Sequence, residues 1–181
     1  MLTTVFALVV VALSLHGTGD RPRVPSPELI AAHIAEGDVS HCDHYRHTIA
    51  RAPVDVQDAV LVGVHLCRNF GTVTAPALSV DGKRWLARTT HCLIEDMEAA
   101  FADEGAHTGT VRGLIAHTAD AHVGCYVAHG FCELSFLDRT ALVDAIDARA
   151  LRASPRLLPA TPALTRAGLA LVGACLARAA D

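Results

Sequence analysis

Six cysteines constrain this chain more than any other feature of its sequence. They are spread over most of the 181 residues, at Cys42, Cys67, Cys92, Cys125, Cys132 and Cys175. An even number of cysteines in a secreted chain is typical of a disulfide framework, in which the bridges decide which segments are neighbours. Because six cysteines can pair in many ways, their spacing alone selects no pairing.

The first residues have the pattern of a secretory signal peptide. Residues 1–15, MLTTVFALVVVALSL, are almost uniformly apolar, and Gly17 and Gly19 stand where a signal peptidase reads small residues before Asp20. This run is shorter than the about 20 residues that cross a bilayer. We therefore expect a signal peptide over 1–19, a disordered lead-in over 20–25, one helical domain over 26–181 and an extracellular location. A membrane anchor or a buried N-terminal helix is the alternative.

Apolar residues recur at helical spacing in nearly every later segment, and strand patterns are weak. Ser26 and Pro27 are typical of a helix start, and Gly37 is typical of a helix end. Further helix starts are expected at Asp55, Asp81, Thr110, Asp138 and Thr161. The sequence thus predicts an all-α fold, a small helical domain stapled by disulfides.

Glycines and prolines mark the expected breaks between these helices. Gly71 is expected to end the helix that begins near Asp55, and residues 72–80, TVTAPALSV, are expected to form a loop or a short strand. Gly105 and Gly130 are expected to stop two later helices.

The charge of the chain excludes two classes of partner. With a net charge of −4 and no basic stripe, the sequence offers nothing to meet nucleic-acid phosphates. An electrostatic membrane binder is excluded for the same reason. The chain also contains neither a G-x-S-x-G nor a G-x-x-x-x-G-K-[ST] motif, and we expect no enzyme activity and no cofactor.

A run of short motifs resembles the stanniocalcins, which are secreted, disulfide-rich, helical glycoprotein hormones. The run consists of Cys67, Gly82-Lys83, Cys92-Leu93, Cys125-Tyr126 and Cys132. In that family a Gly-Lys pair follows a cysteine, and a Cys-Ile or Cys-Leu comes ten residues after the glycine, as here. A later Cys-Tyr is followed by another cysteine seven residues on, as here.

The resemblance implies how the cysteines pair. Mapped by order, they would form the bridges Cys42–Cys67, Cys92–Cys125 and Cys132–Cys175. On this mapping, both cysteines of each missing family bridge are absent, so no cysteine of this chain loses its partner. The resemblance also implies hormone-like, non-enzymatic activity, a role in calcium and phosphate homeostasis, and an extracellular protein receptor or target as the partner.

Two departures from the family pattern matter for partners. No cysteine follows Cys175, so the family's disulfide-linked dimer is not expected, and a non-covalent dimer is left open. In one branch of the family a cysteine near the N-terminus bonds covalently to a metalloprotease. Cys42 is the one cysteine left in that region, and it is expected to lie in a bridge.

Histidines around Cys42 give an alternative, an extracellular metal-binding protein. His41, His44 and His47 are the candidate ligands, and the last two lie one helical turn apart. Zinc needs three or four converging ligands, and Cys42 is expected to be bridged. The competing interpretation is a solvated face rich in histidine.

A second alternative is a secreted phospholipase-like enzyme. The segment from His122 to Tyr126 resembles the secreted phospholipases A2, in which a His-Asp pair precedes a Cys-Tyr. Here Val123 takes the place of the aspartate, and no glycine-rich calcium loop precedes it. Those enzymes need the carboxylate and the calcium ion for their chemistry.

Two further groups of side chains have competing interpretations. The acidic run at the end of the long central helix is either a solvated face or a weak calcium-attracting or basic-partner surface; it comprises Glu95, Asp96, Glu98, Asp103 and Glu104. The large aromatics near the central cysteines are either core or a partner-binding patch; they are Trp85, Tyr126, Phe131 and Phe136.

Overall fold

The computed structural model describes residues 22–102, 109–145 and 161–179. Every regular element in these ranges is helical, and they contain no strand, so the all-α prediction is confirmed. The expected signal peptide over 1–19 and the expected stop at Gly105 lie outside the described residues. Within the described ranges, no helix combines the length and the apolar character that a bilayer crossing requires.

Seven α-helices and four shorter helical segments make up the described part of the chain. In chain order they are α1 (Pro27–Glu36), η2 (Ser40–Asp43), α2 (His44–Arg51), α3 (Val54–Asn69), η3 (Phe70–Thr74), η4 (Ala75–Ala77), α4 (Val80–Ala102), α5 (Val111–Ala128), η5 (Phe131–Glu133), α6 (Phe136–Asp144) and α8 (Thr161–Arg178).

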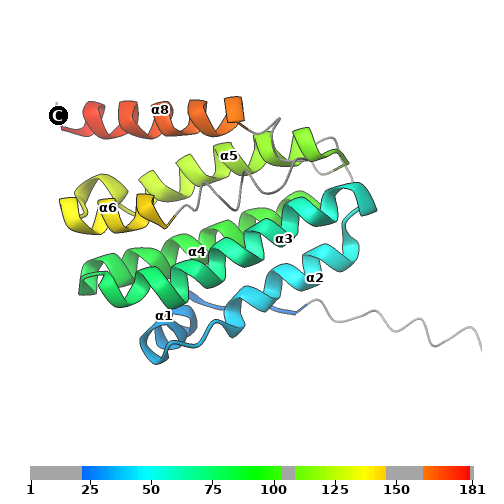
Figure 1. The fold of residues 1–181 in the computed structure, drawn as a ribbon, viewed down its shortest axis with the longest axis horizontal. Coiled ribbons are helices and arrows are strands. Elements are labelled where there is room, and N and C mark those ends of the chain that lie inside the picture. The colour runs from blue at the N-terminus through cyan, green and yellow to red at the C-terminus, as the bar shows by residue number, and fades with distance from the viewer. Residues whose placement is uncertain (1–21, 103–108, 146–160, 180–181) are drawn as a thin grey trace, which may run out of the picture.

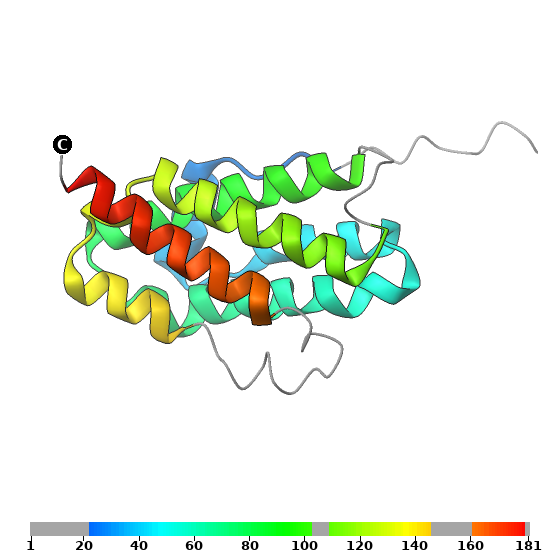
Figure 2. The same cartoon turned by 90° about the horizontal axis from the view of Figure 1, so that it is seen from above.

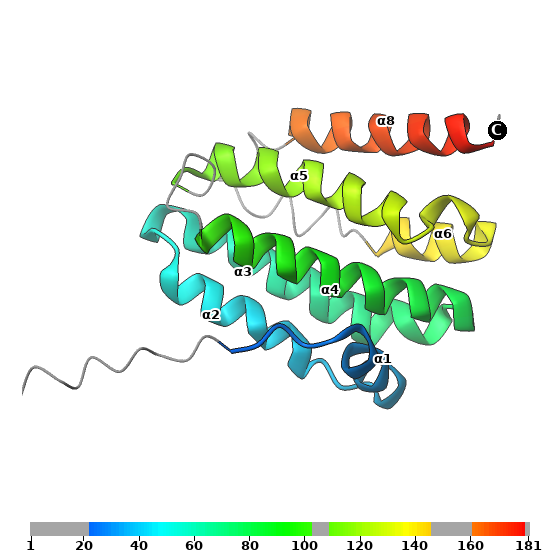
Figure 3. The ribbon, with the colours of Figure 1, turned by 180° about the vertical axis from the view of Figure 1, so that it is seen from behind.

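The helices are stacked, and all of the labelled ones except α1, which is seen nearly end-on, run roughly along the long axis of the molecule (Figure 1). α8 lies at one side, α5 and α6 come next, α3 and α4 form the middle, and α1 and α2 lie at the opposite side (Figures 1 and 3). α4 contacts α1, α2 and α5, while α5 also contacts α3 and α8. α4 and α5 are therefore the two helices that join the halves of the stack.

The core runs between α1, α3 and α4. Its fully buried aliphatic side chains are Ile30, Val56, Val60 and Ile94. On α3, Val56, Val60 and Val64 repeat at the helical spacing that buries one face, as the sequence predicted. α8 contributes no large, fully buried aliphatic side chain among its described residues.

Several predicted helix ends are confirmed. The Ser26 hydroxyl accepts the Leu29 N–H at 3.3 Å, and Gly37 closes α1 with a φ of 70°. Thr110 caps α5 through its side chain, and Gly130, with a φ of 87°, follows the end of that helix. A left-handed φ suits glycine, which carries no Cβ to clash with the backbone.

Three predicted aspartate caps are wrong. Asp55 lies inside the first turn of α3, which begins without a side-chain cap. At the start of α4 the Ser79 hydroxyl, not Asp81, accepts a backbone N–H, that of Gly82 at 3.1 Å. α6 begins at Ser135, whose hydroxyl accepts the Asp138 N–H at 3.0 Å. In the last two cases a serine two or three positions earlier takes the capping position, because Ser and Asp suit it about equally.

Gly71 does not end the helix that precedes it. α3 continues through a π-helical turn, η3, into the short 3₁₀ helix η4, so the loop or strand expected over 72–80 is wrong. Gly71 is buried, and a Cβ placed there would lie 2.7 Å from Val39 Cγ1. The absence of a Cβ at position 71 therefore lets the chain pack closely against Val39, which lies just before η2.

The described part of the expected lead-in contacts the helices. Val24 packs against the core, and His91 Nδ1 lies 2.9 Å from the Pro25 carbonyl oxygen. The expectation of disorder therefore does not hold for Val24 and Pro25.

Candidate functional site

The six cysteines pair in the way that the resemblance implied. Cys42 bonds to Cys67 and Cys92 bonds to Cys125, with Cα–Cα separations of 5.8 and 5.9 Å. Cys132 bonds to Cys175, with a Cα–Cα separation of 5.1 Å. The bridges connect η2 with α3, α4 with α5, and η5 with α8.

The third bridge holds α8 at one end. α8 packs along α5 in both views of the stack (Figures 1 and 2). Near its C-terminal end it is also tied to η5 by the bridge to Cys132 and by an ion pair between Arg178 and Glu133 at 2.7 Å. The covalent bond thus fixes a helix that is peripheral to the core.

The three candidate zinc ligands turn to different neighbours. His41 is buried and its ring stacks on that of His33, with centroids 5.7 Å apart. His44 is buried with its Nε2 3.2 Å from a Glu98 oxygen, and His47 meets His44 edge-on, with centroids 6.3 Å apart. The structure does not bring the three imidazoles together around one point.

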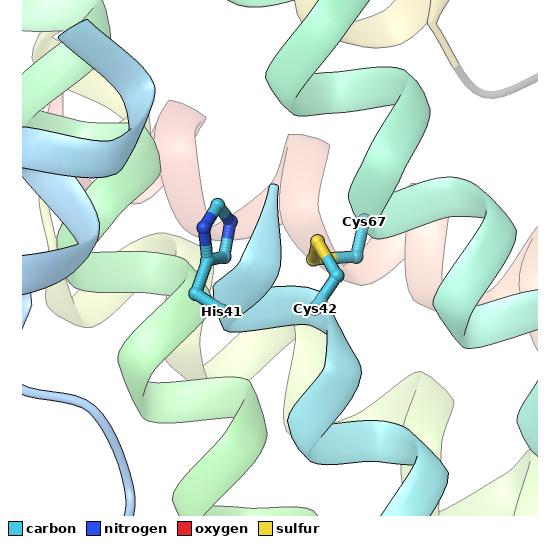
Figure 4. Close-up of side chains that lie close together, drawn as sticks. All are labelled: His41, Cys42 and Cys67. Atoms are coloured by element: carbon cyan, nitrogen blue, oxygen red, sulfur yellow. A yellow bond between two sulfur atoms is a disulfide. The ribbon is translucent and has the colours of Figure 1, made fainter. Parts of the chain in front are cut away.

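A different trio, His41, Cys42 and Cys67, has its nitrogen and sulfur atoms within 4.8 Å of one another. Figure 4 shows the His41 ring beside the bridge between the two cysteines. Both sulfurs are bonded to each other, so neither is a thiolate that could bind a metal. The remaining ligand, His41, is a buried base, and burial lowers its pKa to about 4.

Glu98 is the centre of a partly buried polar network that the sequence did not reveal. Its carboxylate accepts hydrogen bonds from Thr48 Oγ1 at 2.8 Å and from the Arg51 guanidinium, and it lies beside His44. Burial alone would raise the pKa of Glu98, but the bonds from Arg51 and Thr48 and the nearby Arg51 charge lower it below its usual value. The network joins α2 to α4.

The rest of the described acidic run has separate partners. Asp96 lies 2.7 Å from His117 Nε2, and Glu95 lies 3.3 Å from His91 Nε2. Among the described residues these carboxylates form no group that could enclose a cation. Asp103 and Glu104 lie outside the described residues.

The contacts of His122 lie within its own helix, α5. Its Nδ1 lies 2.6 Å from the Thr118 carbonyl oxygen of its own helix, and its ring meets that of Tyr126 edge-on. Burial lowers the pKa of His122. A main-chain carbonyl therefore occupies the ring position that an orienting carboxylate would need in a phospholipase.

Three of the four predicted aromatics form one cluster. The rings of Trp85, Tyr126 and Phe131 lie with centroids 5.0 to 5.6 Å apart. Trp85 and Phe131 are buried, whereas Phe136 lies on the surface with 74% of its side chain exposed. The core interpretation holds for the cluster but not for Phe136. Trp85 and Tyr126 also line an apolar cavity that the sequence did not predict.

An exposed apolar face runs along α8. Leu169, Val172 and Leu176 recur at intervals of three and four residues, and 57 to 69% of each side chain is exposed. This spacing places them on one side of a helix. Small residues fill much of the rest of that exposed surface, and Arg166 is the one charged side chain between Thr165 and Leu176. Exposed apolar area of this kind is typical of a surface that another molecule covers.

Comparison with known proteins gives no relative: no family model, no curated protein and no solved structure matches this chain. The resemblance to the stanniocalcins stays a prediction, carried by the motifs and by the cysteine pairing.

Proposed function

We propose that this chain is a secreted, non-enzymatic regulatory protein of the stanniocalcin type that acts by binding another extracellular protein. The observation that carries the proposal is the exposed apolar face of α8, formed by Leu169, Val172 and Leu176. Apolar side chains at three- and four-residue intervals are the way a helix presents itself to a protein partner. An uncovered face of this kind disfavours a chain that works alone.

The cysteine pairing supports the family part of the proposal. The three bridges join the pairs that the resemblance implied, and the described residues contain no free cysteine. Disulfides of this number are typical of an oxidising compartment, which supports secretion. A hormone-like role in calcium and phosphate homeostasis follows from the resemblance alone.

The geometry also favours binding over catalysis. Each candidate for chemistry has a structural partner: His44 faces Glu98, His122 faces a main-chain carbonyl, and Cys42 lies in a bridge. Among the described residues, the apolar side chains of the α8 face have no such partner. A bridge to η5 holds it in place, so the face is rigid before binding, which lowers the entropic cost of association.

The test is saturable binding of the labelled, disulfide-intact protein to cell membranes of the source organism. The variant Leu169→Glu/Leu176→Glu places two charges on the α8 face and is expected to weaken binding at least about tenfold. The matched control is Leu61→Glu/Val80→Glu, which places the same charges on exposed apolar positions of α3 and α4. Equal binding by both variants, or no saturable binding of the parent protein, would overturn the proposal.

The hormone-like part has its own readout. Applied to cells that bind it, the protein is expected to change calcium or phosphate uptake, and the α8 variant is expected to lose that effect together with its binding. Binding without any change in ion uptake would support the partner-binding proposal and contradict the proposed role in calcium and phosphate homeostasis.

A further inference from the structure

A cavity of about 400 Å³ lies among α3, α4, α5 and α8. Its walls are mostly apolar, with Val60 and Leu66 from α3, Leu93 from α4, Ile115 from α5 and Leu171 from α8. Sites for small molecules in proteins commonly have volumes of about 300–1,000 Å³ and largely apolar walls. Bundles of helices often hold such sites between facing helices.

One polar atom in the wall has no partner. Thr89 lines the cavity and is only 2% exposed, and its Oγ1 makes no hydrogen bond with any described residue. Threonine in a helix can usually bond to a carbonyl of the preceding turn, so this hydroxyl is unusual. A buried hydroxyl without a partner is costly. The Oγ1 is itself shielded from the cavity, so a polar group of a bound molecule would pair with it once the Thr89 side chain turns towards the cavity.

A second polar group in the wall can accept a hydrogen bond. His122 lines the cavity, and its Nδ1 lies 2.6 Å from the Thr118 carbonyl oxygen. A carbonyl oxygen only accepts, so the Nδ1 carries the proton and the Nε2 of the neutral ring is an acceptor. Burial lowers the pKa of His122 and so favours this neutral form.

The charges in the wall decide against an anion. The described residues that line the cavity include no lysine or arginine, and Asp96 is the one acidic residue among them. A carboxylate placed in this apolar space would lose its hydration, find no cation and face Asp96. A neutral hydroxyl avoids all three costs, because it can donate one hydrogen bond and accept another.

We propose that this cavity binds an uncharged, largely apolar molecule with one hydroxyl group, a lipid alcohol, whose hydroxyl pairs with the polar groups of the wall. The site lies on the inner side of α8, opposite the outer face on which the proposed partner binding depends, and its test leaves that outer face unchanged. A sterol and a long-chain alcohol share this chemistry, and the experiment separates them.

Trp85 gives a direct readout of occupancy. It lines the cavity and is the only tryptophan of the chain. The disulfide-intact protein is titrated with dehydroergosterol, a fluorescent sterol that accepts energy from tryptophan, and in a second arm with 1-hexadecanol, read by quenching or shift of Trp85 emission. We expect saturable binding with a stoichiometry near one for at least one of the two alcohols. Palmitate at neutral pH is expected to bind at least about tenfold more weakly than that alcohol.

Two variants and one control locate the binding. Ala59→Phe places a ring into the cavity and is expected to abolish binding, whereas Ala128→Phe adds the same ring to an exposed position of α5 outside the cavity and is expected to leave it unchanged. Thr89→Val keeps the shape of the wall, removes the hydroxyl and is expected to weaken alcohol binding about tenfold. If Ala59→Phe does not fold, judged by circular dichroism, Thr89→Val decides.

Three results would overturn the proposal. The first is the absence of saturable binding by either alcohol. The second is palmitate binding as tightly as the better alcohol, which would contradict the charge argument. The third is alcohol binding that neither Ala59→Phe nor Thr89→Val weakens, which would place the bound alcohol elsewhere. None of these results depends on the α8 outer face, so the partner-binding proposal is tested separately.

Discussion

Asp138 of α6 accepts two hydrogen bonds from Ser79, one from its backbone N–H at 2.8 Å and one from its hydroxyl at 2.7 Å. A third bond comes from the Ser135 hydroxyl at 2.8 Å. Burial alone would raise the pKa of Asp138, but these bonds outweigh it and lower the pKa below its usual value. One buried carboxylate thereby fixes the first turn of α6 against the first turn of α4.

Gly82 is what allows this carboxylate to come so close. A Cβ on Gly82 would lie 2.6 Å from Asp138 Oδ1. Gly82→Ala is therefore expected to lower the free energy of unfolding by about 1–3 kcal/mol, although alanine is the better helix former. The matched control is Gly124→Ala in α5, where a Cβ meets nothing within 4 Å and stability is expected to rise by up to about 1 kcal/mol. Denaturant titration measures both, and equal shifts for the two variants would contradict the close-approach argument.

Glu98→Gln is expected to weaken the junction of α2 and α4. The variant keeps the shape of the side chain but loses the charge that pairs with Arg51, at a site where the Glu98 side chain is 17% exposed. The expected loss is about 2 kcal/mol in the free energy of unfolding. Glu95→Gln, on the same helix at a carboxylate that is 59% exposed, is the control and should change stability by no more than about 0.5 kcal/mol. A Glu98→Gln protein as stable as the control would show that the network is dispensable.

His41 is expected to make the fold acid-sensitive. Burial, and to a smaller extent the charge of His33, lowers its pKa from 6.5 to about 4, while Asp38 opposes the shift. A lowered histidine pKa means that the unfolded chain binds more protons, so stability is full above pH 6.5 and is lost as the pH falls towards 4. The loss attributable to His41 is about 3 kcal/mol at most. His41→Phe should reduce the fall in melting temperature between pH 7 and pH 4. His65→Phe, at an exposed position, should leave the pH dependence of the melting temperature as in the parent protein.

Replacing Cys132 and Cys175 by alanine is expected to free α8 before the rest of the chain. The bridge closes a sequence separation of 43 residues, which the loop-entropy model values at about 4 kcal/mol. α8 packs mainly on α5, so its amides are expected to lose hydrogen-exchange protection while those of α1 and α4 keep theirs. Replacing Cys42 and Cys67, which join η2 to the core helix α3, is the comparison and should lower protection across α2 and α3. Uniform loss of protection in the first variant would mean that α8 is part of one cooperative unit.

The fold was predictable where the signal is local. Ser26, Pro27 and Gly37 define α1 through backbone preferences of single residues, and these need no knowledge of the rest of the chain. The predicted caps at Asp81 and Asp138 failed because a serine stood nearby with the same capping ability. Nothing in the sequence shows that the Asp138 carboxylate accepts hydrogen bonds from Ser79, which lies fifty-nine positions earlier in the chain.

The wrong prediction at Gly71 also arises from a contact with a distant segment of the chain. A glycine can end a helix, or it can admit a neighbouring side chain, and only the path of the chain decides which. Here Val39 occupies the space where the Cβ of another residue would be. The loop expected after Gly71 was wrong for that reason.

The candidate sites show the limit of spacing as a guide. His44 and His47 are one turn apart, as a metal site would require. The Glu98 carboxylate of α4, however, lies 3.2 Å from His44 Nε2. The exposed face of α8 has a regular pattern, but the same pattern would fit a buried helix. The cavity left no trace in the sequence, because an empty volume depends on how four helices fail to fill the space between them.

α8 is one helix thick, and it carries Leu171 on its inner side and Leu169 and Val172 on its outer side. Two surfaces that share a single rigid rod cannot move independently. If the alcohol in the cavity shifts α8, it changes the affinity of the partner protein for the outer face. The partner protein then changes the affinity for the alcohol by the same factor, as thermodynamic reciprocity requires. The bond between Cys132 and Cys175 fixes one end of that helix to η5.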